Sequence, residues 1–130
     1  MKSRFIALFT FTLAVLLVTA CNKEEDTLAE VKVVTPNGST VEGAEVRLFG
    51  QGTTNSTEVG DIRIDEIEYT AANGIAEFDF TNLYVPGQSG FAILNVKITK
   101  EYPDSTVYME GIMKIVEEQV NKKTFTLVGQ

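Results

Sequence analysis

The stretch AEVRLFG, residues 44–50, alternates apolar and charged side chains with a period of two. Val46 and Leu48 fall on one face, and Glu45 and Arg47 fall on the other. This is the pattern of a β-strand that buries one of its two sides. The same alternation recurs along the chain and predicts further strands over residues 29–35, 62–70, 75–80, 91–100, 107–119 and 123–129.

Turn residues separate these segments, as in PNGS (36–39) and PD (103–104). Asn73-Gly74 is typical of a hairpin turn, and the polar stretch 51–61 is expected to be a loop. Seven short strands with regular turn signals predict an all-β fold, a seven-stranded Greek-key sandwich. No Cys…Trp…Cys pattern is present, which excludes a true antibody-type domain.

Two predicted strands have irregular patterns. In 62–70 the apolar positions shift from Ile64 to Ile67 and Tyr69, which predicts a β-bulge near Asp65-Glu66. The composition of 107–119 also allows a helix. A glycine lies inside that segment and its residue types alternate, so we expect a strand there.

The first twenty residues differ from the rest of the chain. Lys2 and Arg4 are followed by an uncharged run from Phe5 to Ala20, which ends in small residues. That order is typical of a secretory signal. The run is 20 − 5 + 1 = 16 residues long, shorter than the ~20 that a membrane-spanning helix needs. We therefore expect residues 1–20 to be a helical signal peptide.

The only cysteine, Cys21, directly follows this run. The residues Val18-Thr19-Ala20-Cys21 resemble the lipobox of bacterial lipoproteins. The resemblance implies that Cys21 becomes the first residue of the mature protein and carries acyl chains such as palmitate. Several chains on one residue anchor a protein to a bilayer without a basic surface. The alternative for Cys21 is a buried small side chain or a reactive thiol.

After the cysteine, Lys23-Glu24-Glu25 resembles the export signal of lipoproteins that reach the outer face of some Gram-negative outer membranes. A solvated, charged tether is the alternative, and both can hold together. We expect a tether over 21–28 and the sandwich over 29–130. The implied location is the outer membrane, lipid-anchored at the cell surface, with the periplasmic face as the alternative.

A second resemblance lies within the sandwich. The motifs VEGAEVRL (41–48) and TAANGIAEF (70–78) resemble the carboxypeptidase regulatory-like, transthyretin-like family of β-sandwich domains. The resemblance covers roughly residues 30–100 and implies a non-catalytic module. The segment between the motifs, residues 51–68, is longer than usual for that family. We expect individual function in it, because loops on a rigid sandwich commonly carry function.

The composition excludes several function classes. The chain has no histidine, so it has no Ser-His-Asp triad and no histidine-based zinc site. A single cysteine allows no internal disulfide. We therefore expect no enzyme, no catalytic residue, no metal and no cofactor. Five acidic residues lie close together in the sequence: Glu58, Asp61, Asp65, Glu66 and Glu68. Their carboxylates could supply the oxygen ligands of a calcium site, but we prefer to interpret them as a solvated acidic face.

The net charge of the whole chain is −7. Loss of residues 1–20 leaves 11 − 2 = 9 basic residues against 18 acidic ones, or −9. Such a chain lacks the basic footprint that nucleic-acid binding needs. Its negative charge also gives it no electrostatic attraction to anionic lipids. We therefore expect the chain to be attached to the lipid bilayer only through acylated Cys21.

Two smaller signals concern the surface. Thr27 and Ser105 lie in short motifs that resemble an O-glycosylation signal of surface and periplasmic proteins, and both are expected to be exposed. Four tyrosines could form a contact surface, although we expect partly buried strand residues: Tyr69, Tyr84, Tyr102 and Tyr108.

The expected function is a non-catalytic binding or interaction module on the outer membrane, accessory to a larger envelope complex, with a protein or glycan partner. The alternative is a structural subunit of a surface appendage or matrix. A long exposed edge strand would favour the structural role. A concave patch formed by 51–68 and 81–90 would favour binding.

Overall fold

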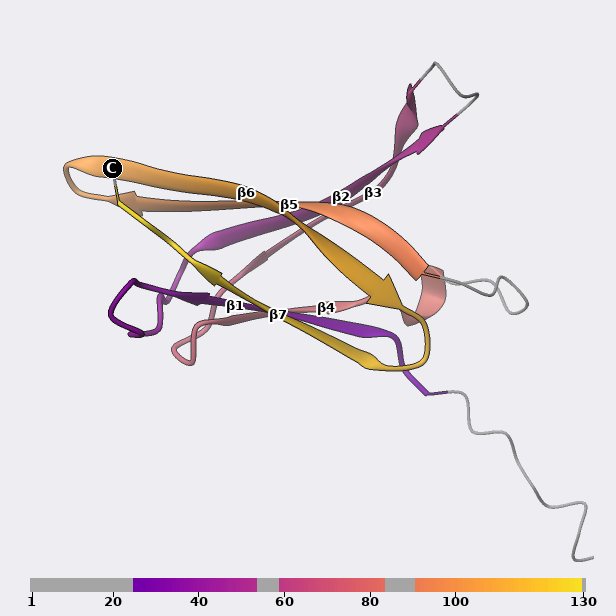
Figure 1. Ribbon diagram of the computed structural model, residues 1–130, viewed down its shortest axis with the longest axis horizontal. Coiled ribbons are helices and arrows are strands. Elements are labelled where there is room, and N and C mark those ends of the chain that lie inside the picture. The colour runs from indigo at the N-terminus through magenta and orange to yellow at the C-terminus, as the bar shows by residue number, and fades with distance from the viewer. Residues whose placement is uncertain (1–24, 54–58, 84–90, 130) are drawn as a thin grey trace, which may run out of the picture.

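A computed structural model describes residues 25–53, 59–83 and 91–129 of the chain (Figure 1). Their strands are β1 (Leu28–Val34), β2 (Glu45–Thr53), β3 (Val59–Tyr69), β4 (Ile75–Asp79), β5 (Phe91–Tyr102), β6 (Ser105–Val116) and β7 (Val120–Thr126). One short 3-10 helix, η1 (Thr81–Leu83), follows β4. The strands form a three-stranded sheet of order β4-β1-β7 and a four-stranded sheet of order β3-β2-β5-β6.

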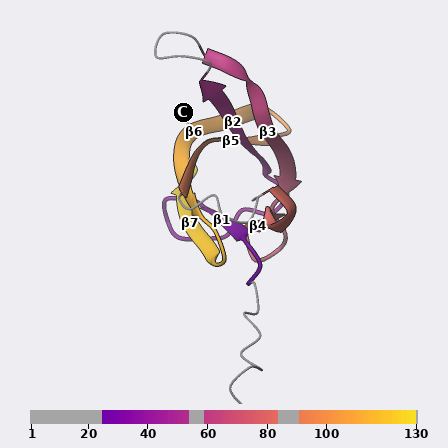
Figure 2. The same ribbon diagram turned by 90° about the vertical axis from the view of Figure 1, so that its right-hand side faces the viewer.

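The two sheets lie face to face, and the chain passes between them several times (Figure 1). β1 pairs with β7 in parallel, and the other pairings are antiparallel. Seen along the strands, β6 lies beside β7 at one corner and β3 beside β4 at the other (Figure 2). The predicted all-β class and the seven-stranded sandwich are confirmed.

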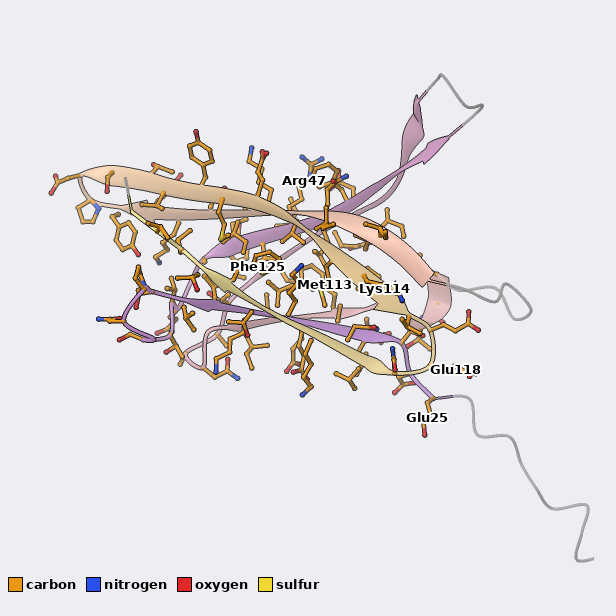
Figure 3. All side chains as sticks on the ribbon, in the orientation of Figure 1. Glu25, Arg47, Met113, Lys114, Glu118 and Phe125 are labelled. Atoms are coloured by element: carbon orange, nitrogen blue, oxygen red, sulfur yellow. The ribbon has the colours of Figure 1, made fainter. Side chains whose placement is uncertain are left out.

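The core lies between the sheets and follows the predicted alternation. Val46 and Leu48 are fully buried, as are Val31 and Val33 on β1. Met113 from β6 and Phe125 from β7 also point into this space (Figure 3). The remaining buried apolar residues among those described come from β1, β4, β5 and β6 or lie beside the strands: Ala29, Ala76, Phe78, Leu94, Val96, Ile98 and Ile115, and Val41, Ala44, Phe80 and Leu127.

The strand predicted over 107–119 is confirmed as β6. Gly111 has no side chain because Phe125 occupies the space: a Cβ there would lie 2.7 Å from Phe125 Cε1. The strand ends at Val116, and the next residues turn, with Glu118 in the left-handed region at φ 56°. The glycine that made a helix less favourable is therefore a packing position of the sandwich.

The expectation of a hairpin at Asn73-Gly74 is wrong. The turn is tight, with the Gly74 N–H donating to Ala71 O at 2.8 Å and Gly74 at φ 74°. It joins β3 to β4, which belong to different sheets, and β4 pairs with β1 instead. The Gly74 carbonyl accepts from the Val33 N–H at 2.8 Å, so this turn is docked onto β1. Local turn chemistry predicted the bend but not the change of sheet.

The bulge predicted near Asp65-Glu66 lies elsewhere. The β2–β3 register is continuous from Glu45↔Tyr69 to Gly50↔Ile64 and shifts only beyond Gly50. Ile67 and Tyr69 therefore lie on the outer side of the sheet, and they are 48% and 60% exposed. The interrupted alternation in this strand therefore reflects two solvent-exposed apolar residues, Ile67 and Tyr69, and neither of them joins the core.

The loop expected over 51–61 is shorter than predicted. β2 continues to Thr53 and β3 begins at Val59, with Thr53 opposite Val59. Gly and Thr residues made this stretch look like a loop, but cross-strand pairing extends both strands into it. Residues 54–58 lie outside the described residues.

Candidate functional site

The candidate site is the solvent-facing side of the four-stranded sheet, which we call the outer face. Cross-strand register assigns its members, because directly opposed residues share a side of the sheet. Three rows run across β3, β2, β5 and β6: Asp65, Phe49, Asn95 and Ile112; Ile67, Arg47, Lys97 and Glu110; and Tyr69, Glu45, Thr99 and Tyr108.

Large apolar side chains gather on the outer face. Tyr108 is 65% exposed, Ile112 54% and Ile93, one row further along β5, 56%. With Ile67 and Tyr69 they place apolar groups on both margins of one sheet surface. Single exposed apolar residues are ordinary, but several on one surface indicate an interaction site.

A charged group lies among these apolar side chains. Arg47 donates from Nε to Asp65 Oδ1 at 2.6 Å and from Nη2 to Asp65 Oδ2 at 2.6 Å, a bidentate pair between β2 and β3. Its guanidinium also lies 4.7 Å from the centre of the Phe49 ring. Figure 3 shows Arg47 projecting away from the other sheet. The bond from Arg47 lowers the pKa of Asp65 below its ordinary value, so this carboxylate stays charged.

The third row ends in a shallow pocket of about 450 Å³ lined by Gly43, Glu45, Tyr69, Thr99 and Glu101. The Tyr69 hydroxyl donates to Glu45 Oε2 at 3.0 Å. That hydrogen bond raises the pKa of Tyr69, so the hydroxyl remains a donor. The pocket offers carboxylates, a hydroxyl and an aromatic ring, which suits polar recognition.

The sequence expectation for the tyrosines is wrong for the three that the structure describes. Tyr69, Tyr102 and Tyr108 are 60%, 43% and 65% exposed, so the alternative of a contact surface is favoured. Tyr84 lies outside the described residues. The interrupted alternation at Ile67 and Tyr69 was the signal that could have revealed this surface.

Of the acidic cluster of residues 58–68, the three members whose side chains are described, Asp65, Glu66 and Glu68, do not lie on one face of the sheet. The side chain of Asp61 lies outside the described part. Asp65 lies on the outer face with Arg47, whereas Glu66 and Glu68 oppose Leu48 and Val46 on the other side of the sheet. Glu58 lies outside the described residues. In the part of the chain that the structure describes, no group of three acidic, histidine or cysteine side chains could hold a metal ion.

Most residues of the predicted anchor, Cys21, Lys23 and Glu24, lie outside the described residues. Glu25 is described and exposed, at the start of the coloured ribbon in Figure 3. Over residues 25–53, 59–83 and 91–129, no helix has the length and apolar character to span a membrane.

Thr27 is buried, with 2% of its surface exposed, so the expectation of an exposed position is wrong. Its Oγ1 accepts from the Glu118 N–H at 2.9 Å, and its carbonyl accepts from the Phe80 N–H at 2.8 Å. Glycosylation of Thr27 would require this end of the sandwich to open. Ser105, at the start of β6, is exposed as expected.

Comparison with known proteins adds no family assignment. No protein-family model matches the chain, and no curated protein matches its sequence.

Proposed function

We propose that the protein is an outer-membrane lipoprotein, acylated at Cys21, that displays the sandwich as a non-catalytic interaction module. The observation that carries this proposal is the outer face. Exposed tyrosine and isoleucine side chains there surround a bidentate Arg47–Asp65 pair. Tyrosine and arginine are enriched at protein interfaces and at their energetic centres.

Thr27 supports a close connection between the anchor and this module. Three hydrogen bonds fix it to the sandwich, because its N–H also donates to Thr81 Oγ1 at 3.1 Å. Thr27 is thus part of the hydrogen-bonded sandwich. Only 27 − 21 = 6 residue steps separate Cys21 from the fold, a reach of about 20 Å.

Site-specific photo-crosslinking on cells tests the interaction role. A photoreactive amino acid at Tyr108 or Tyr69 is expected to capture a defined partner, identified by mass spectrometry. The matched control is Glu77, an exposed β4 position on the other sheet, which should not capture it. The same capture from Glu77, or none from either tyrosine, would contradict a role for the outer face.

The anchor is tested separately. Cys21→Ala is expected to prevent acylation and to leave an uncleaved or soluble product, seen by intact mass and by detergent partitioning. If that variant keeps the mass and the membrane extraction of the wild type, the anchor is wrong.

A second function, structural subunit of a surface assembly, is suggested by the length of the two edge strands of the four-stranded sheet, although the inward-facing Glu66 and Glu68 oppose strand addition at β3. β3 has 11 residues and β6 has 12, and each pairs with one neighbour only. Assembly through both edges would produce long oligomers of this chain alone. Crosslinking of the native protein on cells, followed by sizing, distinguishes that outcome from a complex with another protein.

A further inference from the structure

The N-terminal half of β6, residues 105–111, is an open edge of the four-stranded sheet, which we call the β6 edge. β6 pairs with β5 alone. The Val116 N–H donates to Asn121 Oδ1 at 2.9 Å, and the Val116 and Ile112 carbonyls accept from Asn121 and Lys123 of β7. The backbone groups of even-numbered residues therefore point away from β5, since they alternate along a strand.

Among the described residues, β7 side chains thus bond the backbone of β6 at Ile112 and Val116. Within the β6 edge, the Phe125 ring packs against Gly111 from the core side. Figure 1 shows β6 descending to β7 only at the C-terminal end of β6. Residues 127–129 end near the tip of the β5–β6 hairpin (Figure 1). Within the described chain they make no backbone hydrogen bond to β6, and the Leu127 N–H donates to Val34 O. No other described residue outside β5 bonds the backbone of Thr106, Tyr108 or Glu110, so their donors and acceptors point to an open edge.

The other edge of the same sheet is protected and the β6 edge is not. On β3 the exposed Glu66 and Glu68 lie on the core-facing side, and such inward charges oppose the addition of another strand. The corresponding positions of β6 are Val107 and Met109, half-buried against the rim of the core. An added strand would cover this apolar rim.

We propose that a second copy of this chain pairs with the β6 edge, antiparallel, about a two-fold axis at Tyr108. On the outer face this register places Tyr108 opposite Tyr108 and Thr106 opposite Glu110 of the second copy. On the core side Val107 opposes Met109. Aromatic pairs and apolar pairs across strands are stabilising, and no like charges oppose each other.

One further contact agrees with this register. Asp104 of the second copy would lie opposite Ile112, whose carbonyl holds the Lys123 ammonium at 2.6 Å. The acidic side chain thus approaches a basic one, and the two-fold axis repeats this contact. Two four-stranded sheets would join into one, with both outer faces on the same side.

The neighbouring registers fit less well. An axis at Val107 places Asp104 opposite Glu110, a repulsive pair. An axis at Met109 places Tyr108 opposite Glu110 and Thr106 opposite Ile112, so the aromatic pair across the strands is lost. Pairing β3 with itself about Ile67 would place Glu66 opposite Glu68.

The first test measures the mass of the detergent-solubilised full-length protein by light scattering after size exclusion. The wild type is expected to form a dimer whose fraction rises with concentration. Tyr108→Pro removes an edge N–H that β5 does not use, so the dimer should be lost. The matched control is Tyr69→Pro on the β3 edge, which should leave the dimer intact.

The second test is disulfide crosslinking, which remains informative if Tyr108→Pro fails to fold. Opposed residues of an antiparallel pair lie about 5.5 Å apart between Cα atoms, within the range of a disulfide. Tyr108→Cys should crosslink to itself. Thr106→Cys should crosslink only when mixed with Glu110→Cys. Two controls measure crosslinking that does not depend on the β6 edge: Ile67→Cys, on the β3 edge, and the wild type, whose only cysteine is Cys21.

A monomer at every concentration without a Tyr108→Cys crosslink would overturn the proposal. Oligomers longer than a dimer would also overturn it, because a two-fold pairing closes on itself. The inference is independent of the anchor, which contributes no residue to the β6 edge. Tyr108 and Glu110 belong to both the outer face and the β6 edge, so a photo-crosslink from Tyr108 to a second copy reports this pairing, whereas one from Tyr69 to another protein reports an outer-face partner.

Discussion

At the scale of single residues, Gly111 is a position where the packing of the sandwich leaves no room for a side chain. A Cβ would lie 2.7 Å from Phe125 Cε1, and that ring is buried. Gly111→Ala should therefore lower the free energy of unfolding by about 1–3 kcal/mol, the usual range for overpacking. Urea denaturation measures this. Gly129→Ala is the control, because a Cβ there meets nothing within 4 Å, and an equal effect of both would contradict the argument.

Thr70 is a buried polar residue whose hydroxyl joins two elements. Its Oγ1 donates to Val41 O at 2.6 Å and accepts from the Ala44 N–H at 2.8 Å. Thr70→Val keeps the shape but leaves both backbone groups without this partner. We expect a loss of about 1–3 kcal/mol per unsatisfied buried group. Thr70→Ser, which retains the hydroxyl, should lose less in the same thermal or urea unfolding experiment, and equal losses would contradict the role of the hydroxyl.

The same neighbourhood explains why glycine and alanine follow Glu42 in the sequence. Gly43, at φ 66°, and Ala44 together oppose Thr70: the Gly43 N–H donates to Thr70 O and the Thr70 N–H donates to Ala44 O. This is the pattern of a bulge with glycine in the left-handed position. Glycine and alanine at these two positions thus serve the local backbone geometry at the start of β2.

At the scale of elements, β2 and β3 are joined on the outer face by Arg47 and Asp65. Arg47 lowers the pKa of Asp65, so the folded pKa lies below the unfolded value of about 3.9. The contribution of this pair is present above the unfolded pKa and is lost as the pH falls through the folded one. In an NMR titration, Arg47→Met should raise the pKa of Asp65.

The titration has an internal control on another element. The pKa of Asp79 is lowered by hydrogen bonds from Thr81, at the end of β4, and not by Arg47. Arg47→Met should leave Asp79 unchanged. An unchanged Asp65 in that variant would show that the bidentate pair does not persist in solution.

The positions of the strands were predictable from the sequence, because alternating apolar and polar residues indicate which side of a strand is buried. The buried sides of the strands then pack against each other in the core. The prediction was weakest on β3. An edge strand is covered on one margin only, so Glu66 and Glu68 can face the core side while Ile67 and Tyr69 face solvent. The interrupted alternation at Ile67 and Tyr69 could indicate exposed apolar residues on β3, but which residues of the other three strands join them depends on the register between four strands. Register is set by long-range pairing and not by local composition.

At the scale of the whole molecule, acylation of Cys21, as proposed, would determine which end of the sandwich faces the membrane. Thr27, the turn before β7 and η1 lie at one end, joined by hydrogen bonds between Thr27, Glu118 and Phe80. The β5–β6 hairpin and the turn at residues 35–39 lie at the opposite end (Figure 1). With Cys21 acylated as proposed, the first end stays within about 20 Å of the lipid surface.

This orientation can be measured with fluorophores attached to cysteine variants of the anchored protein in vesicles that carry a headgroup quencher. A label at Gln119, beside the tether, should be quenched more strongly than one at Asn37 or Asp104. The three positions are exposed, so labelling should not disturb the core. Equal quenching at both ends would mean that the sandwich lies flat on the membrane or swings freely. Because the pocket at Glu45 and Tyr69 lies toward the distal end, the expected gradient would present it to partners outside the membrane.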